Sequence, residues 1–436
     1  MNSTHYPRSQ NPNHPVQATQ PRSPAMLKLV TARQEKPSKS AEAQAPERSS
    51  SPMDFASWVK TVKYQTHAVL SQLLELEDER HLDPSWNEVL EQVRDYSLRD
   101  SKRIRPALVL VGYALGKGDT RVPPGLWRFA AATELLHTFM LIHDDVADQA
   151  DTRRGGAALH KMLGEGRLGE NLAVVIGDHL YGRSLEVMLG CGLPGADEAT
   201  RYFLKVCRHT AAGQYLDIRL PHQPLAGLSI FNALRVAHLK TALYGFTAPL
   251  VCGAMLAGAS PQLIHKLESF GRYVGTAFQL RDDLLGLYGQ ASVEGKPTDS
   301  DLAQGKRTFP LLAAYLRATP EARQELETLS IPGPKDEPML RRARELVEQH
   351  GGRAATAHLI ERSINAAARI LDTLPEAGGL ELMLGDLLRS IGTAAVNGGG
   401  VRGGLGAERP RAAAVKQPPL HAAPPGWAPR AHASPG

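Results

Sequence analysis

Residues 127–155 read WRFAAATELLHTFMLIHDDVADQADTRRG, and this stretch indicates the fold class. Its first twenty residues place apolar side chains on most faces of a helix, which is typical of a helix inside a large bundle. The stretch then sets four aspartates within eight positions, followed at once by two arginines. Like charges one helical turn apart repel each other. Unless the segment is simply a solvated charged face, something must offset that repulsion.

The same 3.6-residue period dominates the chain from about residue 53 to residue 395. It predicts further helices over 57–78, 171–189, 198–218, 229–258, 261–289, 308–318, 339–350, 353–374 and 380–391. No convincing strand period or alternation of strands and helices interrupts it. The sequence therefore predicts an all-α fold, a large single-domain helical bundle over residues 53–395, with longer loops at 149–170, 218–229 and 289–307.

The two ends differ from this middle part in composition. Residues 1–52 and 396–436 are rich in Pro, Gly, Ala, Ser and Arg and lack apolar periodicity, so both are predicted to be disordered tails. The first holds seven Lys/Arg and three Glu, the second five Lys/Arg and one Glu. Together they carry +8 of a chain whose net charge is +5, which leaves the predicted domain at −3. The basic pI is thus no argument for nucleic-acid binding.

Other features restrict the class of protein. Cys191, Cys207 and Cys252 stand singly in apolar surroundings, which predicts buried, reduced thiols in a cytoplasmic protein. Runs such as PALVLVGYAL are too short to span a bilayer, so we expect no transmembrane segment. The N-terminus lacks an apolar signal region but is poor in acids and rich in Ser, so an organellar targeting segment stays open, as does a start at Met53.

Two acidic clusters point to a metal. Asp144 and Asp148 lie one turn apart at the end of an apolar helix, with Asp145 beside the first, and FQLRDD ends another apolar helix with Asp282 and Asp283. Two core helices that both carry paired aspartates predict facing carboxylates. Oxygen ligands without His or Cys favour Mg²⁺, which prefers a few carboxylates together with substrate phosphates.

Basic residues accompany these clusters. They are Lys102, Arg103 and Arg105 in SKRIRP, Arg153 and Arg154 after the first cluster, Lys240 in an apolar helix, and Lys296, Lys306 and Arg307 in a Gly-containing loop. A lysine amid VAHLKTALYGF needs an anionic partner if it is buried. Singly, each is more often a surface charge. Together they indicate a diphosphate held through Mg²⁺, beside a second anion held directly by Lys and Arg.

Six motifs in order carry a family resemblance. KRIRP, HDDVADQADTRRG, GQYLD, KTA, FQLRDDLLGLYG and GKPTDSDLAQGKRT resemble those of the trans-isoprenyl diphosphate synthases, the polyprenyl synthetase family, over residues 55–395. The resemblance implies the isoprenoid synthase type of bundle, with a central active-site cavity, and a homodimer. It also implies two substrates, isopentenyl diphosphate and an allylic diphosphate.

The resemblance also implies a role for each matching residue. Asp144, Asp145, Asp148, Asp282 and Asp283 would hold about three Mg²⁺ ions on the allylic diphosphate, which Arg153, Lys240, Lys296 and Lys306 would contact, with Thr241 and Gln279 nearby. Isopentenyl diphosphate would bind Lys102, Arg105, His137 and Arg154. The allylic C–O bond would ionise, the isopentenyl double bond would attack the cation, and loss of a proton would give a product one C5 unit longer.

Some positions depart from the family pattern. Arg99, Asp100 and Ser101 stand where glycines often precede KRxRP, which predicts a stiffer loop. Gly286 stands where many members have a third aspartate, so we expect modestly weaker metal binding. None of these changes removes a group with an assigned catalytic role.

Product length in this family depends on a pocket beneath the first aspartate motif. Met140 lies one turn, about 5.4 Å, below Asp144, and Phe139 is its neighbour. Phe139 is either ordinary core packing or a floor that stops chain growth early. We expect the floor, and hence a geranylgeranyl (C20) product, with farnesyl (C15) second and a longer chain third.

Three other classes compete with this interpretation. A class I terpene cyclase would need a different second metal motif and has little use for KRIRP and His137. A non-catalytic partner subunit would be expected to have lost aspartates or lysines, and both acidic clusters are intact. A nucleic-acid-binding protein rests on the charge of the tails alone.

Overall fold

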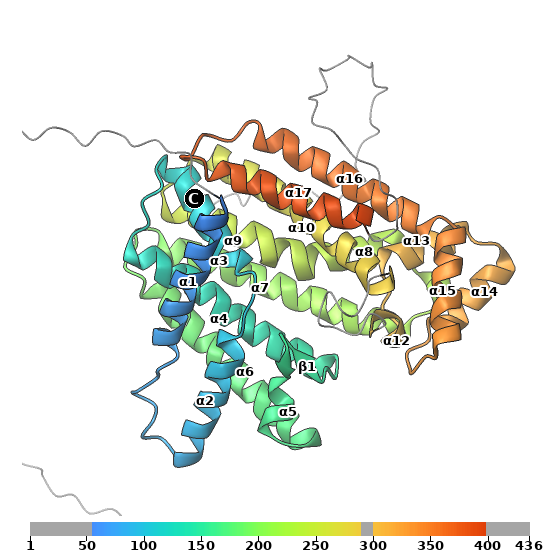
Figure 1. Ribbon diagram of the computed structural model, residues 1–436, viewed down its shortest axis with the longest axis horizontal. Helices are drawn as coiled ribbons and strands as arrows, with labels where there is room; N and C mark the ends of the chain where they lie inside the picture. The colour runs from blue at the N-terminus through green and yellow to red at the C-terminus, as the bar shows by residue number, and fades with distance from the viewer. Residues whose placement is uncertain (1–54, 289–299, 398–436) are drawn as a thin grey trace, which may run out of the picture. The chain divides into compact units, whose positions relative to one another are not determined.

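The computed structural model describes residues 55–288 and 300–397, in which helices dominate (Figure 1). The first half contains α1 (Phe55–Leu73), α2 (Pro84–Leu98), α3 (Ile104–Lys117), α4 (Pro124–Ala147), α5 (Leu159–Leu163), α6 (Gly166–Leu189) and α7 (Ala196–Arg219). Two short strands, β1 (Thr152–Arg153) and β2 (Gly156–Ala157), form an antiparallel hairpin after α4. The predicted all-α fold is confirmed, with this hairpin as an addition.

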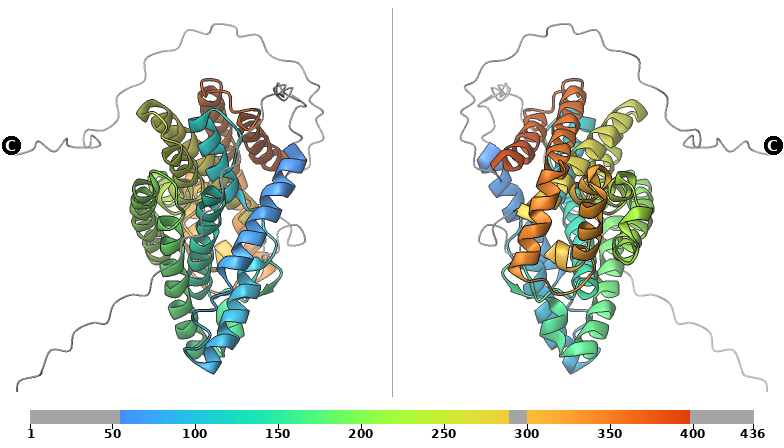
Figure 2. Two further views of the ribbon diagram at one scale, coloured as in Figure 1. Left: turned by 90° about the vertical axis from the view of Figure 1, so that its left-hand side faces the viewer. Right: turned by 90° about the vertical axis from the view of Figure 1, so that its right-hand side faces the viewer.

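The second half continues the bundle. It contains η1 (Leu220–His222), η2 (Leu225–Gly227), α8 (Ile230–Val236), η3 (Ala237–Thr247), α9 (Ala248–Leu256), α10 (Pro261–Tyr288), α12 (Ser300–Ala303), α13 (Phe309–Arg317), α14 (Pro320–Leu329), α15 (Glu337–Gln349), α16 (Gly352–Leu371) and α17 (Glu381–Asn397). All of these helices belong to one compact unit of the chain. The long helices run side by side, as Figure 2 shows from two sides. The predicted tails lie outside the described residues, apart from the last two residues of α17.

The core has two parts that share α3 and α9. One groups α1, α4, α6 and α7 with them, and the other groups α10 and the C-terminal helices. α3 and α9 cross very closely, because a Cβ at Gly112 would lie 2.0 Å from the carbonyl oxygen of Leu250 and one at Gly253 equally close to that of Val109. This crossing fixes the start of α3 against η3, next to the cavity described below.

The long helix predicted over 229–258 is continuous but not uniform. Its central part, η3, is a π-helix, in which hydrogen bonds span five residues rather than four. π-helical turns are rare and often lie at functional sites. Here the π-helix carries Lys240, Thr241 and Tyr244. The stretch Ile230–Leu256 is long and apolar enough to cross a membrane, but 72% of its apolar 18-residue window is buried within the bundle, as in a core helix.

The predicted loops were partly wrong. Within 149–170, the chain forms the hairpin and α5, and α6 already begins at Gly166. The start of α6 was not predicted because glycines such as Gly169 lower helix propensity. A Cβ at Gly169 would lie 2.1 Å from the carbonyl oxygen of His160, so packing requires a glycine there. The loop at 218–229 contains η1 and η2, and α12 lies within 289–307, of which 289–299 is outside the described residues.

Candidate active site

A cavity of about 770 Å³ opens where α4, α7, η3, α10 and α12 meet. This volume is typical of small-molecule sites. Its wall includes Lys102, Asp144, Asp148, Arg153, Asp217, Lys240, Gln279, Asp282, Asp283, Asp301, Gln304 and Lys306. The structure thus brings both predicted acidic clusters and most of the predicted cations to one cavity.

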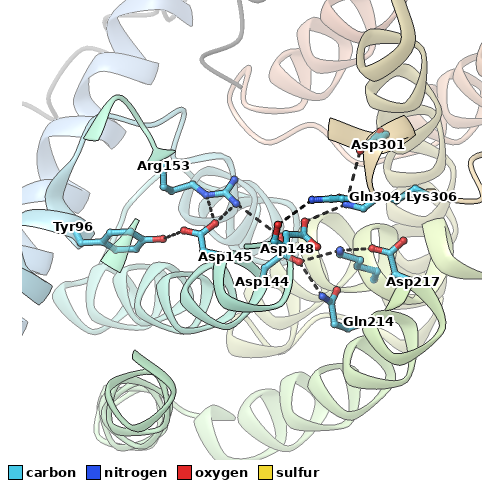
Figure 3. A network of polar contacts seen from close by, with 11 residues as sticks. Tyr96, Asp144, Asp145, Asp148, Arg153, Gln214, Asp217, Asp301, Gln304 and Lys306 are labelled. Carbon is cyan, nitrogen blue, oxygen red and sulfur yellow. Dashed lines mark hydrogen bonds and ion pairs between the residues drawn. The ribbon is translucent and has the colours of Figure 1, made fainter. Parts of the chain in front are cut away.

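The first acidic cluster lies at the C-terminal end of α4, where the helix dipole also disfavours negative charge. Asp144 Oδ1 accepts hydrogen bonds of 3.0 Å from Gln214 Nε2 and from Lys240 Nζ (Figure 3). Burial opposes its ionisation, but Lys240, Lys306 and Arg153 outweigh burial and lower the pKa of Asp144 to about 2. Burial and the nearby Asp144 raise the pKa of Asp148. The two carboxylates therefore compete for the same cations.

Lys240 is held between two acids. Its ammonium donates to Asp144 and, at 2.7 Å, to Asp217 Oδ2 on α7. Burial disfavours the charged form, but Asp144 and Asp217 outweigh burial and raise the pKa of Lys240. The buried lysine therefore has the anionic partners that the sequence analysis required.

Asp145 behaves differently from its neighbours. It is 0% exposed, and it is absent from the cavity wall that the described residues form. Its Oδ2 accepts a hydrogen bond of 2.7 Å from the Tyr96 hydroxyl. Its Oδ1 accepts one of 2.7 Å from Nε of Arg153 and another from Nη2 of the same residue (Figure 3). Both oxygens are thus engaged with protein partners. The geometry makes Asp145 an anchor for Arg153 and does not present it to a metal in the cavity.

The second acidic cluster lies on α10. Asp282 lines the cavity, and its Oδ1 accepts a hydrogen bond of 2.9 Å from Arg281 Nη2. The guanidinium of Arg281 lies over the Phe278 ring, 4.6 Å from its centroid. Asp283 is buried, and its carboxylate accepts from Gln279 Nε2 at 2.9 Å and from the Phe309 backbone N–H at 3.3 Å. Burial, with Asp301 and Asp282 nearby, raises the pKa of Asp283 to about 7.

Further contacts connect this cluster to its surroundings. Thr241 Oγ1 donates to Gln279 Oε1 at 2.6 Å, which joins η3 to α10. Lys306 Nζ reaches Asp148 at 3.1 Å and Asp301 at 3.8 Å. A Cβ at Gly286 would lie 2.5 Å from Oδ2 of Asp301. A carboxylate from α12 therefore fills the space beside Gly286, where many members of the family carry their third aspartate. Lys296 lies outside the described residues.

A separate group of cations gathers beside the Tyr244 ring. Arg105 stacks over this ring at 4.8 Å, and the His137 ring lies 6.1 Å from it. Burial, and then the charges of Arg105 and Arg154, lower the pKa of His137 well below its usual value. Burial also lowers the pKa of Arg154. Arg105 Nε, His137 Nδ1 and Arg154 Nη1 are buried and have no hydrogen-bond partner among residues 55–288 and 300–397. Buried donors of this kind fit an anionic ligand.

The predicted chain-length residues lie deeper on α4. The Phe139 ring contacts His143 at 4.7 Å and Tyr181 of α6 at 5.1 Å between centroids. Phe139 and Met140 are partly buried against the core part that contains α4 and α6. Phe139 thus packs in the contact between α4 and α6, and neither Phe139 nor Met140 is among the described residues that line the cavity.

The donor set fits a hard divalent cation. Asp144, Asp148 and Asp282 present carboxylate oxygens to the cavity, from helices α4 and α10. Within the described part of the chain, no three His, Cys, Asp or Glu side chains enclose a metal site by themselves. This matches Mg²⁺, which is usually held by one or two carboxylates with substrate phosphates and water as the other ligands.

Sequence reasoning missed several residues of this network. Gln214 and Asp217 come from the GQYLD motif, which was used only for the resemblance, and Tyr96, Gln304 and Asp301 were not singled out. Gln214 and Asp217 are three residues apart, on one face at the end of α7. Two polar residues on an otherwise apolar face of a helix could have indicated that both side chains point into the site. The three cysteines are buried and unpaired, as predicted.

An all-α bundle with two acidic clusters and buried cations around one cavity is the architecture expected of an enzyme acting on diphosphates. The family model described as polyprenyl synthetase matches residues 87–347, and the chain belongs to this family. It is therefore a trans-prenyltransferase, as the sequence analysis predicted.

Three similar proteins illustrate the match. A short chain isoprenyl diphosphate synthase of Methanothermobacter thermautotrophicus is 33% identical over 283 residues, 65% of this chain and 83% of the relative. An octaprenyl diphosphate synthase of Escherichia coli is 34% identical over 286 residues, again 65% of this chain and 83% of the relative. The crystal structure of geranylgeranyl pyrophosphate synthase from Corynebacterium glutamicum, complexed with isoprenyl diphosphate and magnesium, has a TM-score of 0.69 at 28% identity. That match covers 77% of this chain and 99% of the other.

Proposed function

We propose that the enzyme condenses isopentenyl diphosphate with an allylic diphosphate and releases pyrophosphate. The observation that carries the proposal is the pairing of two different anion sites. One is a cavity with acidic clusters and lysines, and the other is the group of Arg105, Arg154 and the uncharged His137, in which each side chain has a buried nitrogen without a hydrogen-bond partner among the described residues. A single phosphate-containing substrate would need only one of them.

The allylic diphosphate occupies the cavity in this proposal. Asp144, Asp148 and Asp282 would hold about three Mg²⁺ ions, which would supply positive charge for the diphosphate. Lys240, Lys306 and Arg153 stabilise the same leaving group directly, and these charges are already fixed in place by Asp144, Asp148 and Asp145. The magnesium in the related Corynebacterium glutamicum structure supports the choice of metal.

Isopentenyl diphosphate occupies the second site, between Lys102, Arg105, His137 and Arg154. The allylic C–O bond breaks with its electron pair going to pyrophosphate, and the isopentenyl double bond attacks the resulting cation. The new cation then loses a proton to the released pyrophosphate, which leaves a prenyl diphosphate one C5 unit longer. The apolar walls of the bundle keep water from the cation.

The product is a short all-trans prenyl diphosphate in this proposal, with geranylgeranyl diphosphate first and farnesyl diphosphate second. The support is Phe139, whose ring packs edge-on against His143 and at a tilt against Tyr181, between one and two turns before Asp144 on α4. The similar proteins include both short-chain and octaprenyl synthases, so similarity alone does not select a length.

We further propose that the enzyme is a cytoplasmic homodimer. The homodimer follows from the family resemblance, and α6 offers a surface suited to a second copy. Its side chains Leu168, Leu172 and Val175 share one face and are 63%, 37% and 58% exposed. Light scattering on the purified chain would test the dimer, and a monomer at micromolar concentration would contradict it.

Pyrophosphate release tests the proposed reaction. Release should require isopentenyl diphosphate, an allylic diphosphate and Mg²⁺ together, and chelation of the metal should stop it. Release from the allylic diphosphate alone would instead favour a terpene cyclase. A lack of release under every condition would favour a partner subunit.

A further inference from the structure

Arg99 joins the end of α2 to the hairpin that carries Arg153 and Arg154. Its Nη1 donates to the carbonyl oxygens of Arg153 at 3.0 Å and Ala157 at 2.7 Å. Its Nη2 donates to Asp95 at 2.8 Å, and the side chain is only 13% exposed. Because Arg99 binds one carbonyl oxygen on each strand of the hairpin, it fixes the hairpin to the end of α2.

The hairpin is shaped to receive this side chain. A Cβ at Gly156 would lie 2.6 Å from Cζ of Arg99, so a larger residue there would have to displace the guanidinium. The sequence around Arg99 departs from the family pattern, in which glycines often precede KRxRP. Arg99 and Gly156 therefore fit each other as a pair.

Arg99 is also the middle member of a chain of three arginines. Arg103 donates to Glu134 Oε2 at 2.8 Å and to the carbonyl oxygen of Arg99 at 3.2 Å. Arg99 then holds the carbonyl of Arg153, and Arg153 is bound by Asp145. Glu134 and Asp145 are eleven residues, or three turns, apart on the same face of α4. This series of contacts starts and ends on α4 and connects the loop after α2 to the hairpin.

The peptide that Arg99 holds is a strained one. The carbonyl of Arg153 leads directly into Arg154, which has φ 52°, a left-handed conformation that is unfavourable for residues other than glycine. Arg103, in the other loop, is left-handed as well, with φ 49°. Burial, and then the charges of Arg103 and Arg105, lower the pKa of Arg154, while Glu134 opposes them, and Arg154 Nη1 is buried without a hydrogen-bond partner in the described residues. Three arginines that share the single carboxylate of Glu134 repel one another and need a further restraint to stay in place.

We propose that Arg99 is a positioning residue for isopentenyl diphosphate. It couples the loop with Lys102 and Arg105 to the hairpin with Arg154, so that the two halves of the second anion site face each other before the ligand arrives. The inference rests on the proposed function, because it assigns that anion to isopentenyl diphosphate. Arg153, the contact of the allylic substrate, has its own anchor in Asp145 and depends less on Arg99.

The test compares Arg99→Ala with Arg94→Ala. Arg94 lies on the same helix and donates to Ser71 on α1, so it fastens α2 without touching the hairpin. Arg99→Ala should raise the KM for isopentenyl diphosphate about tenfold, should leave kcat within about threefold, and should change the KM for the allylic diphosphate much less. Arg94→Ala should leave both KM values unchanged, even if it lowers the melting temperature.

A second variant changes the hairpin instead of Arg99. Gly156→Ala keeps Arg99 but should displace its guanidinium from the carbonyl oxygens of the hairpin, and should give the same selective rise in KM, of equal or smaller size. Arg99→Lys, with one ammonium in place of the fork, should recover only part of the affinity. Equal effects on both substrates, or equal behaviour of Arg99→Ala and Arg94→Ala, would overturn the inference.

Binding without turnover separates this inference from the proposed function. Calorimetric titration with isopentenyl diphosphate in the absence of an allylic substrate should show the same tenfold weakening in Arg99→Ala. If the unaltered protein binds isopentenyl diphosphate but gives no condensation, the proposed function fails and the inference stands. If it condenses both substrates and Arg99→Ala binds normally, the inference fails alone.

Discussion

Lys240 Nζ lies 3.0 Å from Oδ1 of Asp144 and joins the π-helix η3 to the end of α4. The pair places a fixed positive charge beside the carboxylate that is proposed to hold the metal. The acids that repel one another along α4 are each matched in this way: Asp144 by Lys240, Asp145 by Arg153 and Asp148 by Lys306. This explains how the helix tolerates them, and why Arg153 follows.

Replacement of either member of the first pair should stop the reaction. Asp144→Ala removes a proposed metal ligand, and Lys240→Ala removes a charge from the leaving group. Loss of one preorganised charge costs about 10²–10³ in kcat. Both variants should keep the far-ultraviolet circular dichroism of the unaltered protein. Normal turnover in either variant would contradict the site assignment.

Asp145 should matter for stability rather than for metal affinity. Asp145→Asn leaves the buried Arg153 charge uncompensated, which should cost about 3 kcal/mol of unfolding free energy. Asp282→Asn is the matched control, since Asp282 is a proposed metal ligand whose side chain is 40% exposed, so the change should weaken Mg²⁺ binding at little cost in stability. Urea unfolding and Mg²⁺ titration measure the two quantities. If Asp145→Asn lost Mg²⁺ affinity as strongly as the control and kept its stability, Asp145 would be a ligand after all.

Phe139 should determine product length. Phe139→Ala opens the space between α4 and α6 below Asp144, and each further turn of depth admits about one C5 unit. The product should therefore shift from C20 to C25 or longer, which chromatography of the dephosphorylated alcohols would resolve. Phe139→Leu should give a smaller shift. An unchanged product spectrum would show that Phe139 only packs in the core and does not limit product length.

His137 should make stability depend on pH. Burial, with Arg105 and Arg154 nearby, holds its folded pKa below the unfolded value of about 6.5. Below pH 6.5 the unfolded chain therefore binds the extra proton, and unfolding free energy should fall as pH falls. Urea unfolding between about pH 7.5 and 5 should show a shallower loss for His137→Gln than for the unaltered protein. Parallel losses would show that His137 is not held neutral.

The sequence predicted the helical period, both acidic clusters and most of the cations, because these depend on spacing along single helices. It could not predict that Asp145 turns away from the cavity. The side-chain direction of Asp145 depends on Tyr96 and Arg153, which come from α2 and the hairpin.

The structure also shows a contact that the sequence did not predict: the carboxylate of Asp301 lies in the space that a side chain at Gly286 would need. The modestly weaker metal binding expected from Gly286 stays a prediction. Periodicity cannot reveal such a contact, because the two residues are on different helices. The π-helical turn around Lys240 was hidden for a similar reason, since an apolar run does not show which hydrogen bonds its backbone forms.

Product analysis tests the central claim most directly. The purified protein would be incubated with Mg²⁺, labelled isopentenyl diphosphate and, separately, C5, C10 and C15 allylic diphosphates, and the dephosphorylated products would be resolved by chain length. We predict a C20 alcohol as the main product, together with pyrophosphate. Products of C30 or longer would keep the chemistry but refute Phe139 as the floor. If no primer gave a condensation product, the proposed function would be contradicted.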